Sequence, residues 1–321
     1  MKTEIKFLLL FIFLIFSFLF SISLGPEIYS PFNLSSLSSV EKSILLKIRL
    51  PRVFAGIIVG GGLSIAGAVF QAILKNPLAE SYTLGISGGA SLGIAIGMIL
   101  GKTASVPFFA FIGALFSITI ILLTSIRKRF SNPTIILLGV ALNFIFSSFV
   151  LFLISIVRNE KFQSTLLFLL GNLSLFPENL LKVSAFFIIL SSLYLIFSSR
   201  VLDILSIGEE KAATTGIDVE KEKKIFFFLC ALITGFCVSL AGIIGFVGLI
   251  IPHISRFIFG SSNRKVLPVS FIIGSGFLII ADAISRTIIK PLEIPVGVIT
   301  GFFGGVFFLF LLVKSKYQEL W

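Results

Sequence analysis

Residues 134–157 read TIILLGVALNFIFSSFVLFLISIV, and this uninterrupted apolar run decides the fold. It contains no charged residue, and a helix of this length, rising about 1.5 Å per residue, crosses a hydrocarbon core of ~30 Å. The run is solid instead of alternating between apolar and polar residues, which excludes the strand pattern of a membrane β-barrel. The stretch therefore predicts a transmembrane helix.

Similar runs recur on both sides of this stretch. They cover residues 7–24, 53–74, 84–101, 105–126, 183–199, 225–244, 266–284 and 294–313. Residues 245–259 form a shorter run, which we interpret as a half-length span, and residues 164–176 predict an interfacial or re-entrant segment. Across 321 residues, 56% are hydrophobic and 13% charged. The sequence predicts an all-α polytopic membrane protein with about ten transmembrane helices in a single domain, residues 1–321.

The positive charges predict the topology. With ten spans both termini lie on one side, and if that side is the cytoplasm, 16 of the 26 lysines and arginines face inward. This excess favours cytoplasmic termini. A signal peptide competes for residues 7–24, because Ser21-Ile22-Ser23 resembles a cleavage site, but the apolar run exceeds the usual signal core. Topology also explains the net charge of +11, so we expect a cytoplasmic-membrane protein that binds no nucleic acid.

The sequence offers no catalytic chemistry. Residues 97–103, GMILGKT, look like a phosphate-binding loop, but only three residues separate the glycines and no strand precedes them. His253 is the sole histidine and cannot form a metal site alone, and Cys230 and Cys237 lie too far apart on one helix for a disulfide. We expect no enzyme, no cofactor and no metal.

Glycines recur every four residues in two of the runs. One row comprises Gly85, Gly89, Gly93, Gly97 and Gly101, and the other comprises Gly297, Gly301 and Gly305. Small residues at this spacing let helix backbones approach closely in lipid. Both rows therefore predict tight helix packing.

The least membrane-like stretch is residues 200–224, in which eleven of 25 residues are charged. Its predicted location is the cytoplasm, and Gly208 and Gly216 would separate short helices. Leu202 and Leu205 give the stretch an apolar face. A plain solvated loop and a structured docking point for a partner both fit this pattern.

A second set of charges lies on the predicted outer side. Asp282 and Arg286 are one helical turn apart and can form an ion pair, which we favour over a transport site for Asp282. Arg49 and Arg52 precede the second span, and exposed guanidinium groups there would suit carboxylates of a docking protein.

Several motifs then identify a resemblance that covers nearly the whole chain. Residues 49–52, RLPR, lead into residues 61–90, GGLSIAGAVFQAILKNPLAESYTLGISGGA; SLAGIIGFVGLIIPHISR follows at 239–256, ADAISR at 281–286 and EIPVGVITG at 293–301. These stretches resemble the signatures of the FecCD/BtuC-type permease family, the membrane subunits of type II ABC importers. Two departures are Ser81, where the family commonly has proline, and Phe168, where it has tryptophan.

The resemblance implies a homodimer with two cytoplasmic ATPase subunits and an extracytoplasmic substrate-binding protein. It implies a transport path between the fifth and tenth spans of the two subunits. By position, the family's docking residues match Arg49, Arg52 and Arg286, and its gate matches Ser131 and Asn132. Its ATPase-coupling residues match Gly208, Glu209, Glu210, Ala212 and Gly216.

The implied activity is import of a metal chelate, for which we expect an iron(III)-siderophore, by alternating access driven by the ATPase partner. Cobalamin, haem and molybdate are alternative substrates within the family. From a different class, the alternative is an ion-coupled secondary transporter. Such proteins usually carry ionisable residues near the membrane midplane, and the apolar runs hold almost none apart from Asp282.

Overall fold

The computed structural model describes residues 3–25, 27, 29, 37–101, 105–128, 131–156, 166–174, 176–289 and 292–314. Every regular element in these ranges is helical, as the sequence predicts. Seven helical stretches are long and apolar enough to span a membrane, and three apolar helices are shorter. These ten coincide with the ten predicted runs, but the count of ten spans stays a prediction because a short helix need not cross a bilayer.

The long helices are α1 (Thr3–Ser23), α5 (Val106–Lys128), α6 (Asn132–Ile156), α8 (Glu178–Phe197), α11 (Val219–Ala241) and α13 (Asn263–Ser285), together with a continuous stretch made of α2 (Ser39–Ile44), the π-helical η2 (Leu45–Arg49) and α3 (Leu50–Leu74). The shorter apolar helices are α4 (Ile86–Ile99), α12 (Val247–Phe259) and α14 (Val296–Lys314). Two small helices, α9 (Ser199–Ile207) and α10 (Glu209–Thr214), lie in the charged stretch.

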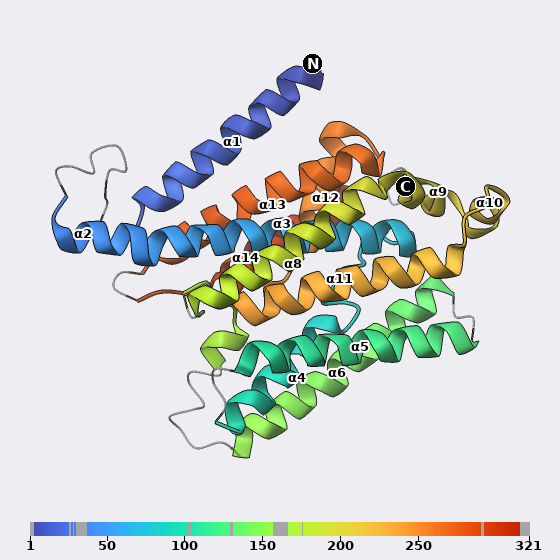
Figure 1. Ribbon diagram of the computed structural model, residues 1–321, viewed down its shortest axis with the longest axis horizontal. Helices are drawn as coiled ribbons and strands as arrows, with labels where there is room; N and C mark the ends of the chain where they lie inside the picture. The colour runs from blue at the N-terminus through green and yellow to red at the C-terminus, as the bar shows by residue number, and fades with distance from the viewer. Residues whose placement is uncertain are drawn as a thin grey trace.

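The central element is α3, which Figure 1 shows running through the middle of the molecule between α13 and α11. It contacts α8 and α12 as well. Of the residues in its most hydrophobic stretch, 83% are buried inside the protein. Burial on all sides suits a helix that is apolar around its whole circumference. The helices α4, α5 and α6 form a separate layer beside α11 (Figure 1).

Glycine lets α3 approach its neighbours at backbone distance. A methyl group on Gly60 would overlap the carbonyl oxygen of Gly274 in α13, and one on Gly67 would overlap that of Gly248 in α12. In the first predicted row, Gly89 and Gly93 meet α5 in the same way. The packing predicted for that row is confirmed at these positions.

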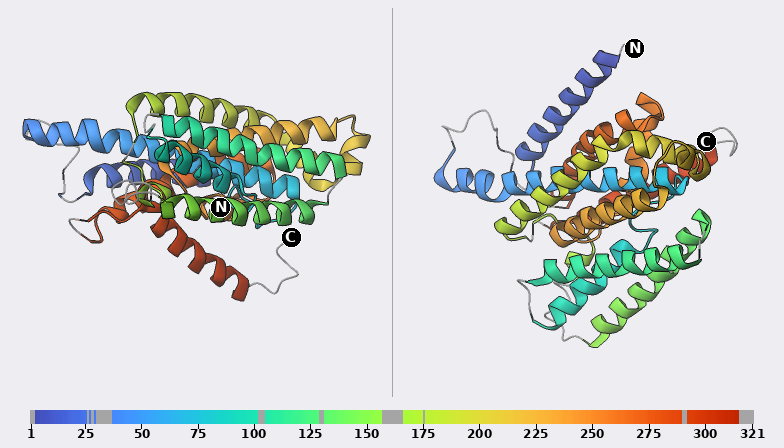
Figure 2. Two further views of the ribbon diagram at one scale, coloured as in Figure 1. Left: turned by 90° about the horizontal axis from the view of Figure 1, so that it is seen from below. Right: turned by 45° about the vertical axis from the view of Figure 1, so that its right-hand side comes forward.

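The second glycine row differs from the prediction. Gly297 is crowded by the carbonyl oxygen of Leu170, but a methyl group on Gly301 or Gly305 would meet nothing within 4 Å. Both lie on α14, which leans away from the rest of the molecule (Figure 2, left). Among the described residues, neither glycine is therefore needed for a close helix approach.

The second span begins earlier than predicted. Its helix starts at Ser39 instead of residue 53 and is continuous for 36 residues. The Ser38 hydroxyl accepts a hydrogen bond from the Glu41 N–H, and the Glu41 carboxylate accepts one from the Ser38 N–H, which forms a capping box. The search for apolar runs missed residues 39–52 because charged residues interrupt this part of the helix.

Both cysteines are free and buried, with Cys230 0% and Cys237 1% exposed. The predicted interfacial segment 164–176 includes residues 164, 165 and 175, which lie outside the described residues. Around Asn172 the segment turns inward, because the Asn172 N–H donates to the carbonyl oxygen of Ala241 at 2.7 Å. The segment thus packs against the break between α11 and α12.

Candidate functional site

Functional features gather at the two ends of α3 and on α14. At the start of α3 lies a group that we call the arginine cluster: Arg49, Arg52, Asp282, Arg286 and Glu293. Arg52 Nη2 is 2.8 Å from Asp282 Oδ1, and Arg52 Nη1 is 2.8 Å from Glu293 Oε2. Arg286 Nε is 3.1 Å from Asp282 Oδ2. Two guanidinium groups thus share the Asp282 carboxylate.

Further donors of the cluster bind the backbone at the C-terminal end of α1. Arg49 Nη1 donates to the carbonyl oxygens of Ile22 at 2.9 Å and Ser23 at 3.0 Å. Arg286 Nη2 donates to the carbonyl oxygen of Ser21 at 3.1 Å. These bonds fasten the end of α1 to both α3 and α13.

The expectation of exposed arginines is wrong for this conformation. Arg49, Arg52 and Arg286 are 4%, 5% and 3% exposed. A buried guanidinium group needs a counter-charge or acceptors, and the sequence analysis missed the acceptor Glu293, which lies 241 positions from Arg52. Only long-range folding brings these two residues together.

At the opposite end of the molecule, α9 and α10 form a compact knob (Figure 1). Ala212 is fully buried within it, as are Leu202 and Leu205. Gly208 separates the two helices, and Gly216 ends the knob in the left-handed conformation at φ 82°. The plain solvated loop is therefore wrong as a description of residues 200–216.

The knob is tied to the transmembrane helices at two points. Asp203 Oδ1 accepts hydrogen bonds from the Asn263 backbone N–H at 2.7 Å and from Asn263 Nδ2 at 2.8 Å, which joins α9 to the start of α13. Glu209 pairs with Lys223 of α11. Glu210 is exposed and forms no ion pair among the described residues. The arrangement can transmit movement of the knob to α11 and α13.

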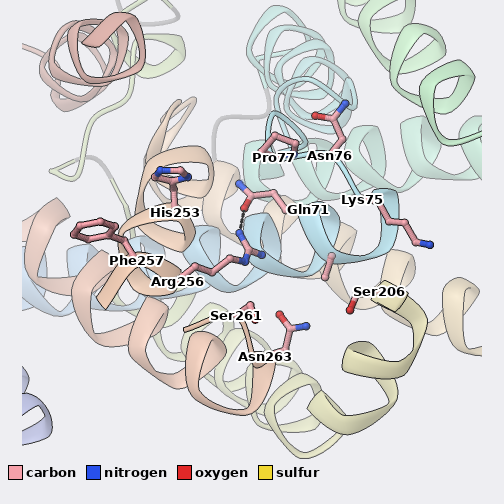
Figure 3. A pocket seen from close by; sticks show the side chains of 11 residues that line it. Gln71, Lys75, Asn76, Pro77, Ser206, His253, Arg256, Phe257, Ser261 and Asn263 are labelled. Atoms are coloured by element: carbon pink, nitrogen blue, oxygen red, sulfur yellow. Dashed lines mark hydrogen bonds between the residues drawn. The ribbon is translucent and has the colours of Figure 1, made fainter. Parts of the chain in front are cut away.

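Between the end of α3, α9 and α12 lies a cavity of about 500 Å³, which we call the Arg256 pocket (Figure 3). Gln71, Lys75, Asn76, His253, Arg256 and Asn263 line it, among others. Figure 3 shows Arg256 reaching across from α12 to Gln71 of α3, to whose side-chain oxygen it donates. The sequence analysis did not identify this pocket.

The sequence analysis also missed Glu80, which follows α3 and is only 6% exposed. The backbone N–H of Phe246 hydrogen-bonds its carboxylate. Phe246 adopts a left-handed conformation at φ 67° directly before α12. Glu80 thus stabilises the N-terminus of a short helix, where the helix dipole favours negative charge.

The predicted gate and path residues lie on α6 and α14. Ser131 and Asn132 stand at the start of α6, where the Ser131 and Thr134 hydroxyls hydrogen-bond at 2.8 Å. The α14 helix exposes large apolar side chains such as Phe302 and Leu309, at 67% and 62%. Beside it is an apolar cavity of about 600 Å³ lined only by side chains of α12, α13 and α14.

Comparisons with known proteins agree with this arrangement. The model of the FecCD transport family matches residues 10–314. The chain is 36% identical to an ABC transporter permease protein of Bacillus subtilis, over 95% of this chain and 92% of the relative. It is 34% identical to the vitamin B12 import system permease protein of Vibrio vulnificus, over 91% and 88% of the two chains.

A third relative is the iron(3+)-hydroxamate import system permease protein of Bacillus subtilis, 29% identical over 95% of this chain and 96% of the relative. Among solved structures, an inward-facing conformation of a metal-chelate type ABC transporter matches with a TM-score of 0.88 and 26% identity. The match covers 98% of this chain and 100% of that chain.

Proposed function

Because this chain belongs to the FecCD transport family of ABC importer permeases, we propose that it imports an iron(III)-siderophore across the cytoplasmic membrane by alternating access. In this proposal the chain acts as a homodimer with both termini in the cytoplasm. It receives the substrate from an extracytoplasmic binding protein and draws its energy from two ATPase subunits.

The names of the relatives support a metal chelate as the substrate. One relative imports an iron(3+)-hydroxamate and another vitamin B12, and the matching structure is of the metal-chelate type. The large apolar cavity beside α14 suits a bulky ligand with a mostly apolar surface. Cobalamin stays an alternative, because the identity of 34% to a vitamin B12 permease is higher than the 29% to the hydroxamate permease.

The observation that carries the proposal is the exposed apolar face of α14. Exposed apolar side chains such as Phe302 and Leu309, the cavity beside α14, and the open space at Gly301 and Gly305 are surfaces that the described residues leave uncovered. A second copy would cover them, since small residues at this spacing allow close helix association in lipid. The path would then run between α6 and α14 of the two copies, past Ser131 and Asn132.

The knob supports coupling to an ATPase. It is folded and it presents Glu210 to the solvent, whereas Glu209 is partly held by Lys223. Fixed bonds to α11 and α13 would carry its displacement into the transmembrane helices. We assign ATPase coupling to Gly208, Glu209, Glu210, Ala212 and Gly216, of which the buried Ala212 would act by holding the knob together.

The arginine cluster supports binding-protein docking only in a modified form. Three arginines of the cluster face the two carboxylates Asp282 and Glu293, and the Glu27 carboxylate lies near Arg49 and offsets part of the remaining positive charge. An acidic surface would be attracted by the charge that is left, but direct pairing would require a guanidinium group to leave its internal acceptors. In this proposal Arg49, Arg52 and Arg286 shape and charge the docking site from beneath its surface.

Uptake by proteoliposomes tests the proposal. The permease, its ATPase and its binding protein are reconstituted, and uptake of radiolabelled ferric hydroxamate, cobalamin and haemin is compared. We expect uptake of the ferric chelate that requires ATP and persists when ion gradients are collapsed. Preference for cobalamin or haemin would overturn the substrate, and uptake driven by a proton gradient without ATP would indicate a secondary transporter.

A further inference from the structure

The Arg256 pocket is lined by two cationic side chains, those of Arg256 and Lys75. Figure 3 shows the Lys75 amine at the rim, directed away from Arg256, and no aspartate or glutamate among the described residues is part of the lining. Asp203 of the knob lies beside the pocket, because its carboxylate accepts hydrogen bonds from the lining residue Asn263 and from Ser262. That carboxylate lies outside the lining, whose charged side chains are Arg256 and Lys75.

Arg256 is the buried component of this charge. Its guanidinium group donates to the Gln71 side-chain oxygen and to the carbonyl oxygen of Ala68 at 3.3 Å, and both acceptors are neutral. Among the described residues no carboxylate forms an ion pair with it. A partly buried charge without a counter-ion is costly, and an anion that enters from outside would offset the cost.

The surroundings of the pocket indicate where such an anion comes from. Phe257 lines the opening and is 88% exposed. Lys6 of α1 donates to the carbonyl oxygen of Ile258 and lies 5.6 Å from the centre of the Phe259 ring. Lysines near helix ends extend their amines to the headgroup layer while their aliphatic stems stay in the hydrocarbon, so Lys6 is consistent with a headgroup layer at this level.

The volume points in the same direction. The pocket volume of about 500 Å³ is many times the ~30 Å³ that one water molecule occupies. A bare inorganic anion would therefore fill only part of it. A phosphate attached to a glycerol backbone would fill more, and its acyl chains could leave past Phe257. Basic pockets between helices on the cytoplasmic side are suited to phospholipid headgroups.

We propose that the Arg256 pocket binds the phosphate of an anionic phospholipid, held by Arg256 and by Lys75, whose exposed side chain would turn in from the rim of the pocket. The assignment to the cytoplasmic leaflet rests on the proposed topology; the binding itself does not depend on transport. Because the pocket borders both α9 and the end of α3, a bound lipid would brace the knob against the central helix.

Lipid retention by the purified full-length chain tests the proposal. The protein is placed in nanodiscs of phosphatidylcholine containing a minor fraction of phosphatidylglycerol, and bound lipid is measured by native mass spectrometry after release. We expect phosphatidylglycerol to be retained by the parent and reduced at least several-fold in Lys75→Gln and Arg256→Gln. Lys75 is exposed, so its variant should fold even if Arg256→Gln does not. Lys221→Gln, which removes an exposed lysine from the same side, is the matched control.

Thermal stability separates the sources of the anion. Short-chain phosphatidylglycerol should raise the melting temperature of the parent in detergent but not that of Lys75→Gln, and inorganic phosphate at the same concentration should have little effect. Equal protection by inorganic phosphate would overturn the lipid assignment. So would unchanged retention in both variants, or lipid displaced stoichiometrically by the ATPase subunit, which would identify the pocket as a protein contact. These readouts involve no transport, so their failure is distinct from failure of the proposed function.

Discussion

At the scale of single residues, the decisive feature is the sharing of one buried carboxylate by two arginines. Asp282→Asn would leave Arg52 and Arg286 buried with too little negative charge, and loss of one partner of a buried pair costs about 3–5 kcal/mol. We expect a large fall in melting temperature in detergent. Glu293→Gln is the control: its side chain is 38% exposed, so its loss should cost no more than about 1 kcal/mol. A loss of stability in Asp282→Asn no larger than that in Glu293→Gln would contradict the special role given to the shared carboxylate.

The same cluster yields a prediction about docking. Arg52→Glu places a negative charge beside Asp282 and should destabilise the fold itself, whereas Arg52→Lys keeps the charge but loses the bidentate geometry. We expect Arg52→Lys to weaken binding-protein affinity modestly and with little salt dependence, because the guanidinium group acts from beneath the surface. Affinity of the permease complex is measured at low and high salt. A large loss confined to low salt would instead indicate that Arg52 contacts the binding protein directly.

At the scale of elements, the approach of α3 to α12 depends on glycine. Gly67→Ala would push its methyl group into the Gly248 carbonyl and force the two helices apart. Overpacking of this kind costs about 1–3 kcal/mol, and we expect a lower melting temperature. Gly301→Ala, with nothing within 4 Å, is the control and should leave the melting temperature of the monomeric chain unchanged. A stable Gly67→Ala protein would contradict the close approach.

The knob allows an internal bond to be separated from an external contact. Glu209→Lys breaks the ion pair with Lys223 and should lower the substrate-stimulated ATPase activity of the reconstituted complex. The double variant Glu209→Lys, Lys223→Glu restores an ion pair, so we expect its stimulated activity to recover. Glu210→Lys should reduce substrate-stimulated ATPase activity of the reconstituted complex without rescue. Normal stimulation in Glu210→Lys, or no rescue of Glu209→Lys, would contradict the roles given to these residues.

Prediction from the sequence worked where the physical signal is local. The apolar runs located every long helix, and the half-length run 245–259 became α12. The burial of Glu80 escaped detection because a charged residue between two runs is normally solvated, and its acceptor role depends on Phe246, far along the chain. The link between Asp203 and Asn263 was missed for the same reason. Such contacts exist only after the helices are arranged in space.

At the scale of the whole molecule, α14 predicts self-association. Replacing Gly301 and Gly305 with leucine should block the close helix contact and shift the protein from dimer to monomer, as measured by size-exclusion chromatography with light scattering. Thr119→Leu adds similar bulk at an exposed position on α5 and should leave the dimer intact. Were the leucine variant still dimeric, the interface would lie elsewhere and the proposed path with it.

The burial of both cysteines has a practical consequence for studying motion in this transporter. Cys230 and Cys237 lie inside the helix packing, where a thiol is out of reach of water-soluble reagents. A maleimide dye or nitroxide should therefore react only with a cysteine introduced at the surface, without removal of the native ones. The unaltered background can then report distances between the knob and α14 during the transport cycle, by fluorescence energy transfer or electron spin resonance.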